Sequence, residues 1–426
     1  MEHFAYRDDQ LFCGGVPVAD VALQHGTPAY IYSAEAIREN YRALRDAFAA
    51  VNPLICYAVK ANYSLAVCKI LRDEGSGFDV VSGGELFRAL KTGADPQTIV
   101  YAGVGKTRGE IESALKSGIL MFNVESRAEL DRINAIAGEL GVQAQVALRL
   151  NPDVDANTHR HTTTGTKETK FGIDLKSAAG LAAVLMETKH ARLAGVHVHL
   201  GSPINTTEPY TKALGLVVGF IESCREIGSE IEWIDIGGGY GIEYKGGETV
   251  GPEEYAKAII PYIERSGCRA ILEPGRYLVG NAGVLVTTVQ YVKNSGGKTF
   301  VICDAAMNDL IRPALYDSFH RVWPVRSAEP VPYGAEALDA RTGGRVVVDL
   351  VGPVCESGDY LARGRSLPPV RQDDLLAVFS AGAYGYSMSS NYNSRPRACE
   401  VMIERGSARV IRPRESYEDM IAQEQF

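Results

Sequence analysis

The sequence has no excess of basic residues, no long apolar run and no leading apolar stretch, and each absence excludes a class of protein. Its 44 Lys and Arg are outnumbered by 52 Asp and Glu, for a net charge of -8, whereas nucleic-acid and anionic-membrane partners need a basic face. No run approaches the roughly 20 apolar residues of a membrane helix. The N-terminal MEHFAYRDDQ carries charges where a signal peptide is apolar. We therefore expect no nucleic-acid partner and no membrane partner.

Paired cysteines, low-complexity tracts and fixed-period repeats are also missing. None of the eight cysteines forms a C-x-x-C pair, and most lie inside apolar runs such as LICYAVK and TFVICDA. This pattern favours reduced thiols in a cytoplasmic protein over a disulfide framework. With 46% hydrophobic and 23% charged residues, the composition is that of an ordinary globular protein. At 426 residues, the chain is long enough for more than one domain.

Between residues 27 and 275, short apolar runs alternate with longer amphipathic segments. Each run is rich in Val, Ile, aromatic or Cys residues and is bounded by Gly, Asn, Asp or Pro, as strands are. The segments between them, such as SGGELFRALKTG, have apolar residues at helical spacing and end on Gly. The runs are 54–59, 77–81, 98–101, 120–124, 146–150, 195–199, 233–236 and 270–272. Eight β-then-α units predict an α/β fold with a closed (β/α)8 TIM-type barrel.

After the barrel, the sequence reads as strands with few helices between them. Examples are VLVTTVQYVKN, KTFVICDAAM, GRVVVDLVG and ACEVMIERGSARVIRP. These segments predict a C-terminal β-sandwich or β-barrel domain. We therefore expect a barrel domain at 27–275, and a β domain at 1–26 plus 276–426.

Active sites of such barrels lie in the loops that follow the strands, so residues at strand ends are the first candidates. Lys60 follows the first predicted strand, and Asp79 lies on the second. His199 ends the sixth, Gly237–Gly239 follows the seventh, and Glu273–Arg276 ends the eighth. A lysine, a histidine, a glycine loop and a Glu/Arg pair should therefore meet on one face of the barrel.

Each of these groups has a chemical use and a structural alternative. A partly desolvated lysine can form a Schiff base, but Lys60 could also be a surface residue. The glycine loop lets backbone N–H groups approach a phosphate, and phosphate sites favour the loops after the last two strands. His199 could be a buried core residue. The His197/His199 pair resembles a metal motif, but no third ligand with zinc-like spacing follows, so we expect no metal.

Six motifs, in order, resemble the pyridoxal-phosphate decarboxylases of the alanine-racemase fold. They are AVKAN at 58–62, FDVVSGGE at 78–85, HVHLGS at 197–202, DIGGGYG at 235–241, EPGRY at 273–277 and CESGD at 355–359. The resemblance extends from about residue 30 to residue 397. It implies a barrel followed by a β domain, a pyridoxal 5'-phosphate cofactor, and a homodimer whose active sites are shared across the interface.

The resemblance also assigns roles to single residues. Lys60 matches the lysine that binds the cofactor covalently, and His199 matches the histidine that stacks on its ring. Cys355 and Glu356 match a pair that reaches into the partner subunit's site. The other residues predicted to bind the cofactor are Asp79, Ser202, Gly237, Gly238, Gly239, Glu273, Gly275, Arg276 and Tyr384.

Glu273 and Cys355 favour decarboxylation over other reactions on this fold. A carboxylate against the pyridine nitrogen keeps that nitrogen protonated, so that the ring withdraws electrons strongly. Cys355 would return a proton as the general acid, since a free thiol titrates near about 8.5. A Glu-Pro-Gly turn and a buried structural cysteine are the alternatives. A racemase is disfavoured by Glu273 and by the Cys355–Glu356 pair, and a non-catalytic binding protein is expected to lose Lys60 or Cys355.

The predicted substrate is meso-2,6-diaminopimelate. The segment IRPALYD at 311–317 is similar to the branch of the family that acts on diaminopimelate. An arginine fork suits the distal carboxylate, and an acid suits the distal ammonium. The predicted substrate contacts are Arg276, Arg312, Tyr316, Glu356 and Tyr384. We expect a carboxy-lyase that forms L-lysine and CO2, the last step of bacterial-type lysine biosynthesis. An ornithine-, arginine- or carboxynorspermidine-type decarboxylase is the alternative.

Overall fold

The computed structural model describes residues 3–156, 164–165, 169–247, 249–332 and 344–425. Its contacts divide the chain into a barrel unit, residues 40–241 and 249–277, and a β unit, residues 1–39, 242–248 and 278–426. The sequence predicted that the barrel domain begins at residue 27 and ends at 275. Residues 27–39 lie instead in the β unit, because β4 (Ala29–Ser33) pairs with two strands of that unit.

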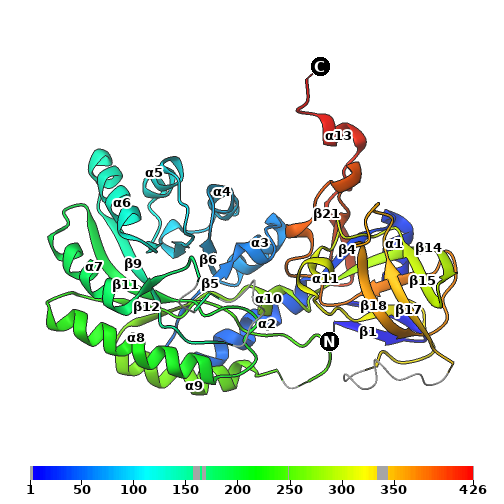
Figure 1. Ribbon diagram of the computed structural model, residues 1–426, viewed down its shortest axis with the longest axis horizontal. Coiled ribbons are helices and arrows are strands. Elements are labelled where there is room, and N and C mark those ends of the chain that lie inside the picture. The colour runs from blue at the N-terminus through cyan, green and yellow to red at the C-terminus, as the bar shows by residue number, and fades with distance from the viewer. Residues whose placement is uncertain (1–2, 157–163, 166–168, 248, 333–343, 426) are drawn as a thin grey trace. The chain divides into compact units, whose positions relative to one another are not determined.

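The barrel unit is built on eight parallel strands that pair in chain order and close on themselves (Figure 1). Closure comes from β13 and β5, where Ile271 pairs with Leu54. A two-residue strand, β10 (Ile173–Asp174), extends β9. The eight strands are β5 (Leu54–Ala58), β6 (Gly77–Val80), β7 (Ile99–Tyr101), β8 (Met121–Val124), β9 (Ala144–Asn151), β11 (Ala191–Val198), β12 (Trp233–Asp235) and β13 (Arg269–Leu272). Each overlaps one predicted apolar run, so the predicted barrel is confirmed.

Helices lie outside the barrel strands (Figure 1); the first of them precedes β5, and each of the others follows a barrel strand. They are α2 (Ala34–Ala47), α3 (Leu65–Asp73), α4 (Gly83–Lys91), α5 (Arg108–Ser117), α6 (Arg127–Leu140), α7 (Leu175–Glu187), α8 (Glu208–Glu226) and α9 (Pro252–Ser266). α6 begins at Ser126, whose side chain accepts a hydrogen bond from Glu129 N. Glu129 does not complete a capping box there, because its carboxylate accepts a hydrogen bond from Glu125 N instead. A reciprocal capping box starts α5 at Thr107.

A buried layer of apolar side chains fills the barrel. It is formed by Cys56, Val100, Leu120, Met121, Ala147, Ala194, Trp233 and Ile271. These residues come from seven of the eight strands or their immediate starts. Because the interior is packed, it is a core and not a channel. Polar side chains are therefore expected where the strands end.

The β unit contains a nine-stranded sheet. Its main path is β18-β17-β15-β14-β4-β20-β21, and β19 joins β16 to β14. These strands are β14 (Gly283–Ser295), β15 (Lys298–Cys303), β16 (Val322–Pro324), β17 (Val346–Val351), β18 (Tyr360–Leu367), β19 (Leu375–Val378), β20 (Cys399–Glu404) and β21 (Ser407–Arg412). A second sheet comprises β1 (Phe4–Arg7), β2 (Gln10–Cys13) and β3 (Val16–Pro17). The predicted β domain is confirmed as a sheet domain.

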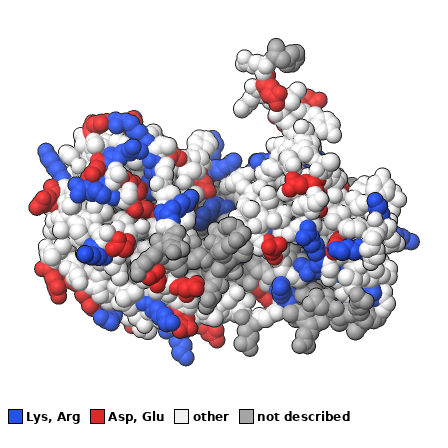
Figure 2. All heavy atoms as spheres, viewed as in Figure 1, with Lys and Arg blue, Asp and Glu red and all other residues white. Residues whose placement is uncertain are grey.

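Short helices complete the β unit and the connection to it. They are α1 (Val18–His25), α10 (Arg276–Val279), α11 (Arg312–Tyr316) and α13 (Tyr417–Ile421). On the face shown in Figure 2, Lys and Arg side chains are interspersed with Asp and Glu. Among the described residues, no helix is long and apolar enough to cross a bilayer.

Candidate active site

Lys60 and Asp79 form an ion pair at the end of two neighbouring barrel strands. Lys60 lies in a 3₁₀ turn (Val59–Ala61) directly after β5. Its Nζ atom is 2.7 Å from Oδ2 of Asp79, a fully buried residue of β6 that pairs with Ala58 in the sheet. Burial raises the pKa of Asp79, the nearby Glu273 raises it further, and Lys60 opposes both. Asp79 therefore holds the lysine amine at the mouth of the barrel.

Glu273 is the first residue after β13 and is buried. Its Oε2 lies 3.2 Å from His197 Nε2, and its Oε1 accepts a hydrogen bond from Asn123 Nδ2 at 3.3 Å. Burial by itself would raise the pKa of Glu273. The interactions with His197 and the charge of Lys60 outweigh burial, so the pKa lies well below its ordinary value. Glu273 is therefore a carboxylate at neutral pH.

His199 lies just beyond β11, in the same cavity as His197. Both imidazoles reach this cavity because residues two apart on a strand share a face. His199 Nδ1 accepts a hydrogen bond from Gly238 N at 3.2 Å. Burial, with the positive charges of Lys60 and Arg149, lowers the pKa of His199 well below its ordinary value. The ring is therefore neutral and can present a flat face to a ligand.

The glycine loop after β12 packs directly against the ends of the neighbouring strands. A Cβ on Gly238 would lie 2.1 Å from the carbonyl oxygen of Glu273, and one on Gly237 would lie 2.4 Å from that of Val198. Only glycine fits at these two positions, because a side chain would overlap the neighbouring backbone carbonyl. Gly239 meets the Gly201 carbonyl in the same way, at 2.5 Å.

Ser202 and Arg276 supply the polar side chains near this loop. Arg276 is buried, and its Nε donates to Ser202 Oγ at 3.1 Å. Gly275 packs on the Ala58 methyl, where an added Cβ would lie 3.1 Å away. A hydroxyl and a guanidinium beside this glycine loop are donors that suit a phosphate, whereas Gly237 N and Gly238 N already donate to Asp235 and His199. The predicted phosphate residues of the barrel unit thus lie together.

A cavity of about 430 Å³ lies beside Lys60, His199 and Glu273, within the usual size for a small-molecule site. It is lined by Lys60, Val81, Ala102, Gly103, Val104, Gly105, Glu110, Arg149, Thr164, Phe171, His197, His199 and Glu273. Three buried polar atoms at this end of the barrel have no partner among the described residues, namely Asp79 Oδ1, Asn123 Oδ1 and His197 Nδ1. An amine and a neutral imidazole line the cavity, and the glycine loop adjoins it through the hydrogen bond to His199, so these residues fit a pyridoxal phosphate.

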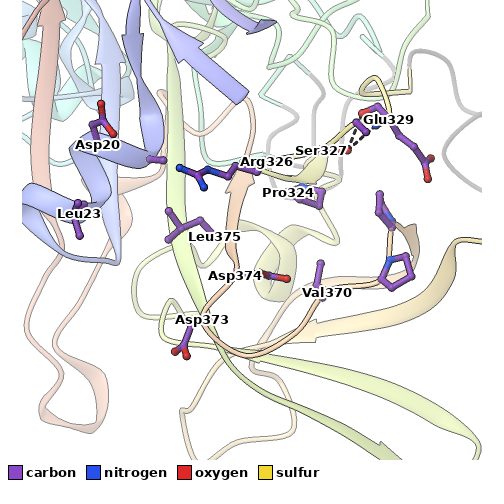
Figure 3. A pocket seen from close by; sticks show the side chains of 14 residues that line it. Asp20, Leu23, Pro324, Arg326, Ser327, Glu329, Val370, Asp373, Asp374 and Leu375 are labelled. Atoms are coloured by element: carbon purple, nitrogen blue, oxygen red, sulfur yellow. Dashed lines mark hydrogen bonds between the residues drawn. The ribbon is translucent and has the colours of Figure 1, made fainter. Parts of the chain in front are cut away.

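A second cavity, of about 570 Å³, lies in the β unit (Figure 3). Leu23 of α1 and Leu375 of β19 line it together with Arg326, Asp373 and Asp374. None of the predicted site residues is among the residues that line this cavity. It therefore does not compete with the cavity of the barrel unit as the active site.

Three polar residues of the barrel unit that contact the site were given no role from the sequence. Asn123 of β8 bonds Glu273, and Asp235 of β12 bonds the glycine loop. Arg149 of β9 lines the cavity, bonds Glu125 at 2.8 Å and stacks over Phe171 at 4.9 Å. The signal was present in each case, because all three are polar residues at or next to the end of an apolar strand.

His197, Asp235 and Glu273 also present one donor atom each within 4.8 Å of one another. Such a set could hold a metal ion. Its three residues belong to three different strands or strand ends, so spacing along the sequence does not reveal the set. Hydrogen bonds already join His197 and Asn123 to Glu273. The expectation that no metal is bound stays a prediction.

Arg312 and Tyr384 lie together in the β unit. Arg312 is buried at the start of α11, and its guanidinium lies 5.5 Å from the ring of Tyr244 and 5.9 Å from that of Tyr384. Its Nε donates to Nε2 of His320 at 3.3 Å. His320 is fixed in turn, because its Nδ1 donates to the Phe379 carbonyl at 2.9 Å. The guanidinium is therefore held in one orientation.

Two other predicted residues flank this arginine. Tyr384 has a φ of 56°, a backbone conformation that is uncommon outside glycine and is concentrated at functional sites. Tyr316 is half-buried at the end of α11.

Cys355 and Glu356 lie on an exposed loop of the β unit. Cys355 N donates to Asn393 Oδ1 at 3.0 Å, and Glu356 Oε2 accepts from the Tyr392 hydroxyl at 3.0 Å. Buried Asp359 shapes the loop by accepting a hydrogen bond from Val354 N at 2.7 Å. Six of the other seven cysteines are buried, so Cys355 differs from them in its access to solvent.

Comparison with known proteins indicates the same cofactor as the residues around this cavity. The model of the pyridoxal-binding domain of pyridoxal-dependent decarboxylases matches residues 34–280, more than half of the chain. The chain belongs to the pyridoxal-dependent decarboxylase family. Pyridoxal phosphate is thus its cofactor, and the barrel unit of this decarboxylase is the part that the family model covers.

Full-length relatives of this decarboxylase are diaminopimelate decarboxylases. That of Aquifex aeolicus is 46% identical over 98% of this chain and 96% of the relative. That of Pseudomonas aeruginosa is 45% identical over 100% of this chain and 99% of its own.

Solved structures agree with these relatives. The Helicobacter pylori diaminopimelate decarboxylase in complex with L-lysine has a TM-score of 0.89 and 39% identity, covering 95% of this chain and 98% of that one. Lysine/ornithine decarboxylase from Vibrio vulnificus, at 22% identity and a TM-score of 0.79, covers 91% of this chain and 97% of its own. That second likeness shows the shared fold alone.

Proposed function

We propose that this pyridoxal-dependent decarboxylase removes one carboxylate from meso-2,6-diaminopimelate and forms L-lysine and CO2. The observation that carries the reaction type is buried, ionised Glu273 in the same cavity as Lys60. The substrate is supported by the full-length diaminopimelate decarboxylases that the chain resembles, and by the L-lysine bound to the Helicobacter pylori relative.

The barrel unit would hold the cofactor from three sides. Lys60 would bind it covalently, His199 would lie against its ring, and Asp79 would keep the lysine in place. Bound pyridoxal phosphate supplies an electron sink for the electron pair left when CO2 departs. The phosphate contacts would be Ser202, Gly237, Gly238, Gly239, Gly275 and Arg276, and Tyr384 would contribute from the β unit.

Two residues of this chain would hold or transfer protons during the reaction. Glu273, ionised and held by His197 and Asn123, would keep a proton on the pyridine nitrogen. Cys355, an exposed thiol on a shaped loop, would return a proton to the carbon that has lost CO2. A thiol suits this step because it titrates within about two units of neutrality.

Substrate selection would fall to the β unit. Arg312 would bind the distal carboxylate through its planar fork, and Glu356 would bind the distal ammonium. The fixed orientation of Arg312 between His320 and Ser318 reduces the entropy lost when it binds a carboxylate. The other substrate contacts would be Arg276, Tyr316 and Tyr384.

Lysine at position 312 should weaken diaminopimelate recognition. We expect Arg312→Lys to lower kcat/KM for diaminopimelate by about 10- to 100-fold, because an ammonium cannot form the bidentate pair. Cofactor affinity should stay the same. Steady-state kinetics checks this, with Arg371→Lys as the matched control, since the Arg371 side chain is exposed and pairs only weakly with Asp374. An unchanged kcat/KM would remove Arg312 from the substrate site.

We propose further that the enzyme is a homodimer in which Cys355 and Glu356 serve the partner's cofactor. Both side chains are exposed in the single chain. Mixing inactive Lys60→Ala with inactive Cys355→Ala should restore activity to about a quarter of the wild-type level, since half of the random dimers would have one intact site. If the mixture stays inactive while hetero-dimers are demonstrably present, each site uses its own Cys355.

Product identification tests the function as a whole. Purified protein with pyridoxal phosphate is offered meso-diaminopimelate, ornithine and arginine separately, and CO2 and the amino-acid product are measured. Lysine from diaminopimelate alone is the expected result. If CO2 is released from ornithine or arginine instead, the family assignment holds, but diaminopimelate is not the substrate.

A further inference from the structure

Three tyrosine rings pack together against the glycine loop of the barrel unit. Tyr210 lies near the start of α8, Tyr255 near the start of α9, and Tyr240 in the loop itself. All three are almost completely buried. Tyr210 stacks on Tyr240 with ring centroids 5.8 Å apart, and Tyr255 meets these two rings edge-on at 5.7 and 4.9 Å. The loop is therefore supported by the two helices that follow β11 and β12.

Two of these tyrosines also bond the loop and its neighbour through their hydroxyl groups. The Tyr210 hydroxyl donates to the Gly238 carbonyl oxygen at 2.9 Å. The Tyr255 hydroxyl accepts a hydrogen bond from Gly241 N at 3.3 Å and donates to the Ile204 carbonyl oxygen. Phenylalanine would give the same ring packing, and burying a hydroxyl costs free energy unless it is paired. The two hydroxyls therefore have a use at the loop that packing does not explain.

The hydrogen bond from Tyr210 also sets the direction of a backbone donor. Gly238 O and Gly239 N belong to one planar trans peptide, in which the C=O and N–H groups point in opposite directions. Because Tyr210 holds the carbonyl, the Gly239 N–H points away from this tyrosine. Gly239 N has no acceptor among the described residues, whereas the two preceding N–H groups of the loop are already bonded. A phosphate on that side of the loop would meet a donor that Tyr210 has aimed.

We propose that Tyr210 and Tyr255 are positioning residues for the phosphate end of the cofactor. Their hydroxyls fix the path of residues 238–241, so that the loop does not have to be ordered when the phosphate binds. This inference rests on the phosphate site proposed above, which combines the glycine loop with Ser202 and Arg276. It assigns the two tyrosines to the phosphate and not to the pyridine ring, which makes their effect separable.

Phenylalanine at either position keeps the ring and removes the hydroxyl. We expect Tyr210→Phe and Tyr255→Phe each to weaken binding of pyridoxal phosphate by about 10-fold, since a buried backbone group loses its partner. Pyridoxal, which has the ring and the aldehyde but no phosphate, should bind within about twofold of wild type, because independent sites do not couple. Absorbance titration of the apo-protein with each compound measures both affinities. An unchanged ratio of the two affinities in either variant, which a purely structural role predicts, would overturn the proposal.

Two other tyrosines of the same region serve as matched controls. The hydroxyl of Tyr240 has no hydrogen-bond partner in the described part of the chain, so Tyr240→Phe should keep the wild-type ratio. Tyr262 is half-buried and lies about two turns beyond Tyr255 on α9, and Tyr262→Phe should keep it as well. A changed ratio in either control would show that phosphate affinity does not depend on the two hydroxyl bonds, and the proposal would fail.

Ser202→Ala separates this inference from the phosphate site on which it rests. If that variant lowers the ratio and the tyrosine variants do not, the phosphate site stands and the role of the tyrosines is refuted. If Ser202→Ala leaves the ratio unchanged, the proposed role of Ser202 fails, while the tyrosine variants still decide the role of the loop.

A crystal structure of the wild-type holoenzyme decides the case in which a tyrosine variant does not fold. The phosphate should lie against the Gly239 N–H, with the bond between Tyr210 and Gly238 intact. A phosphate bound elsewhere, or a loop released from Tyr210, would refute the proposal.

Discussion

Replacing Lys60 with alanine is expected to abolish the visible absorbance of bound pyridoxal phosphate and the release of CO2 together. Lys60 is the amine at the end of β5 that lines the cavity and pairs with buried Asp79. Without it the cofactor has no covalent anchor, and kcat/KM should fall by roughly a factor of 10⁴ or more. The loss also leaves the Asp79 side chain without its cation. Absorbance and CO2 assays on the same preparation check both outcomes.

Two further variants separate chemistry from folding. Lys60→Arg keeps a cation beside Asp79 but cannot bind the cofactor covalently, so it should be as inactive as alanine while remaining folded. Lys69→Ala on α3 removes an exposed lysine that pairs with Asp73 and should behave as wild type. Substantial activity in either Lys60 variant would mean that the barrel cavity is not the active site.

Glutamine at position 273 should have the second largest effect and should leave the cofactor in place. The amide cannot hold a proton on the pyridine nitrogen, so the ring loses much of its electron-withdrawing power. We expect kcat to fall by roughly 10²- to 10³-fold, the usual range for removing one electrostatic contact to a transition state. The bound cofactor should still absorb in the visible range, because Lys60 is unchanged. Single-turnover CO2 release measures the chemical step.

The matched control is Glu253→Gln, since Glu253 lies in the exposed first turn of α9. A normal rate for that variant shows that a glutamate-to-glutamine change in the barrel unit is tolerated in itself. If Glu273→Gln kept the wild-type kcat, the carboxylate would not set the protonation of the ring, and the reasoning that separates decarboxylation from racemisation would fail.

The barrel was predictable because its strands are buried on both faces and read as continuous apolar runs. β10, with only two residues, is too short to give such a signal. β4 could not be assigned to its sheet from the sequence. AYIYS has the composition of a strand, but nothing local to it indicates that it pairs with β14 and β20 and not with the barrel. Pairing between distant segments depends on the whole fold.

The candidate site was only partly predictable for the same reason. Lys60, His199 and Glu273 could be named from strand ends and motifs, and the structure places all three in one cavity. The Lys60–Asp79 pair follows from the register of β5 on β6, which a sequence does not give. Asp235 was noticed only as the first letter of a glycine motif. Its hydrogen bond to Gly237 N is local, whereas its link to Glu273 through Asn123 exists because strands that are distant in the sequence meet in the barrel.

The position of β4 has a consequence for the chain while it is being synthesised. Ala29 pairs with Cys399. During synthesis, β4 therefore cannot pair with β20 until the ribosome has added 370 more residues. At about 5–20 residues per second, that delay is roughly 20–70 s. All five of its side chains are buried in the finished protein, and an apolar strand with open edges is a template for wrong pairing. A chaperone that covers residues 29–33 would therefore protect this enzyme chiefly on the ribosome, before the β unit can form.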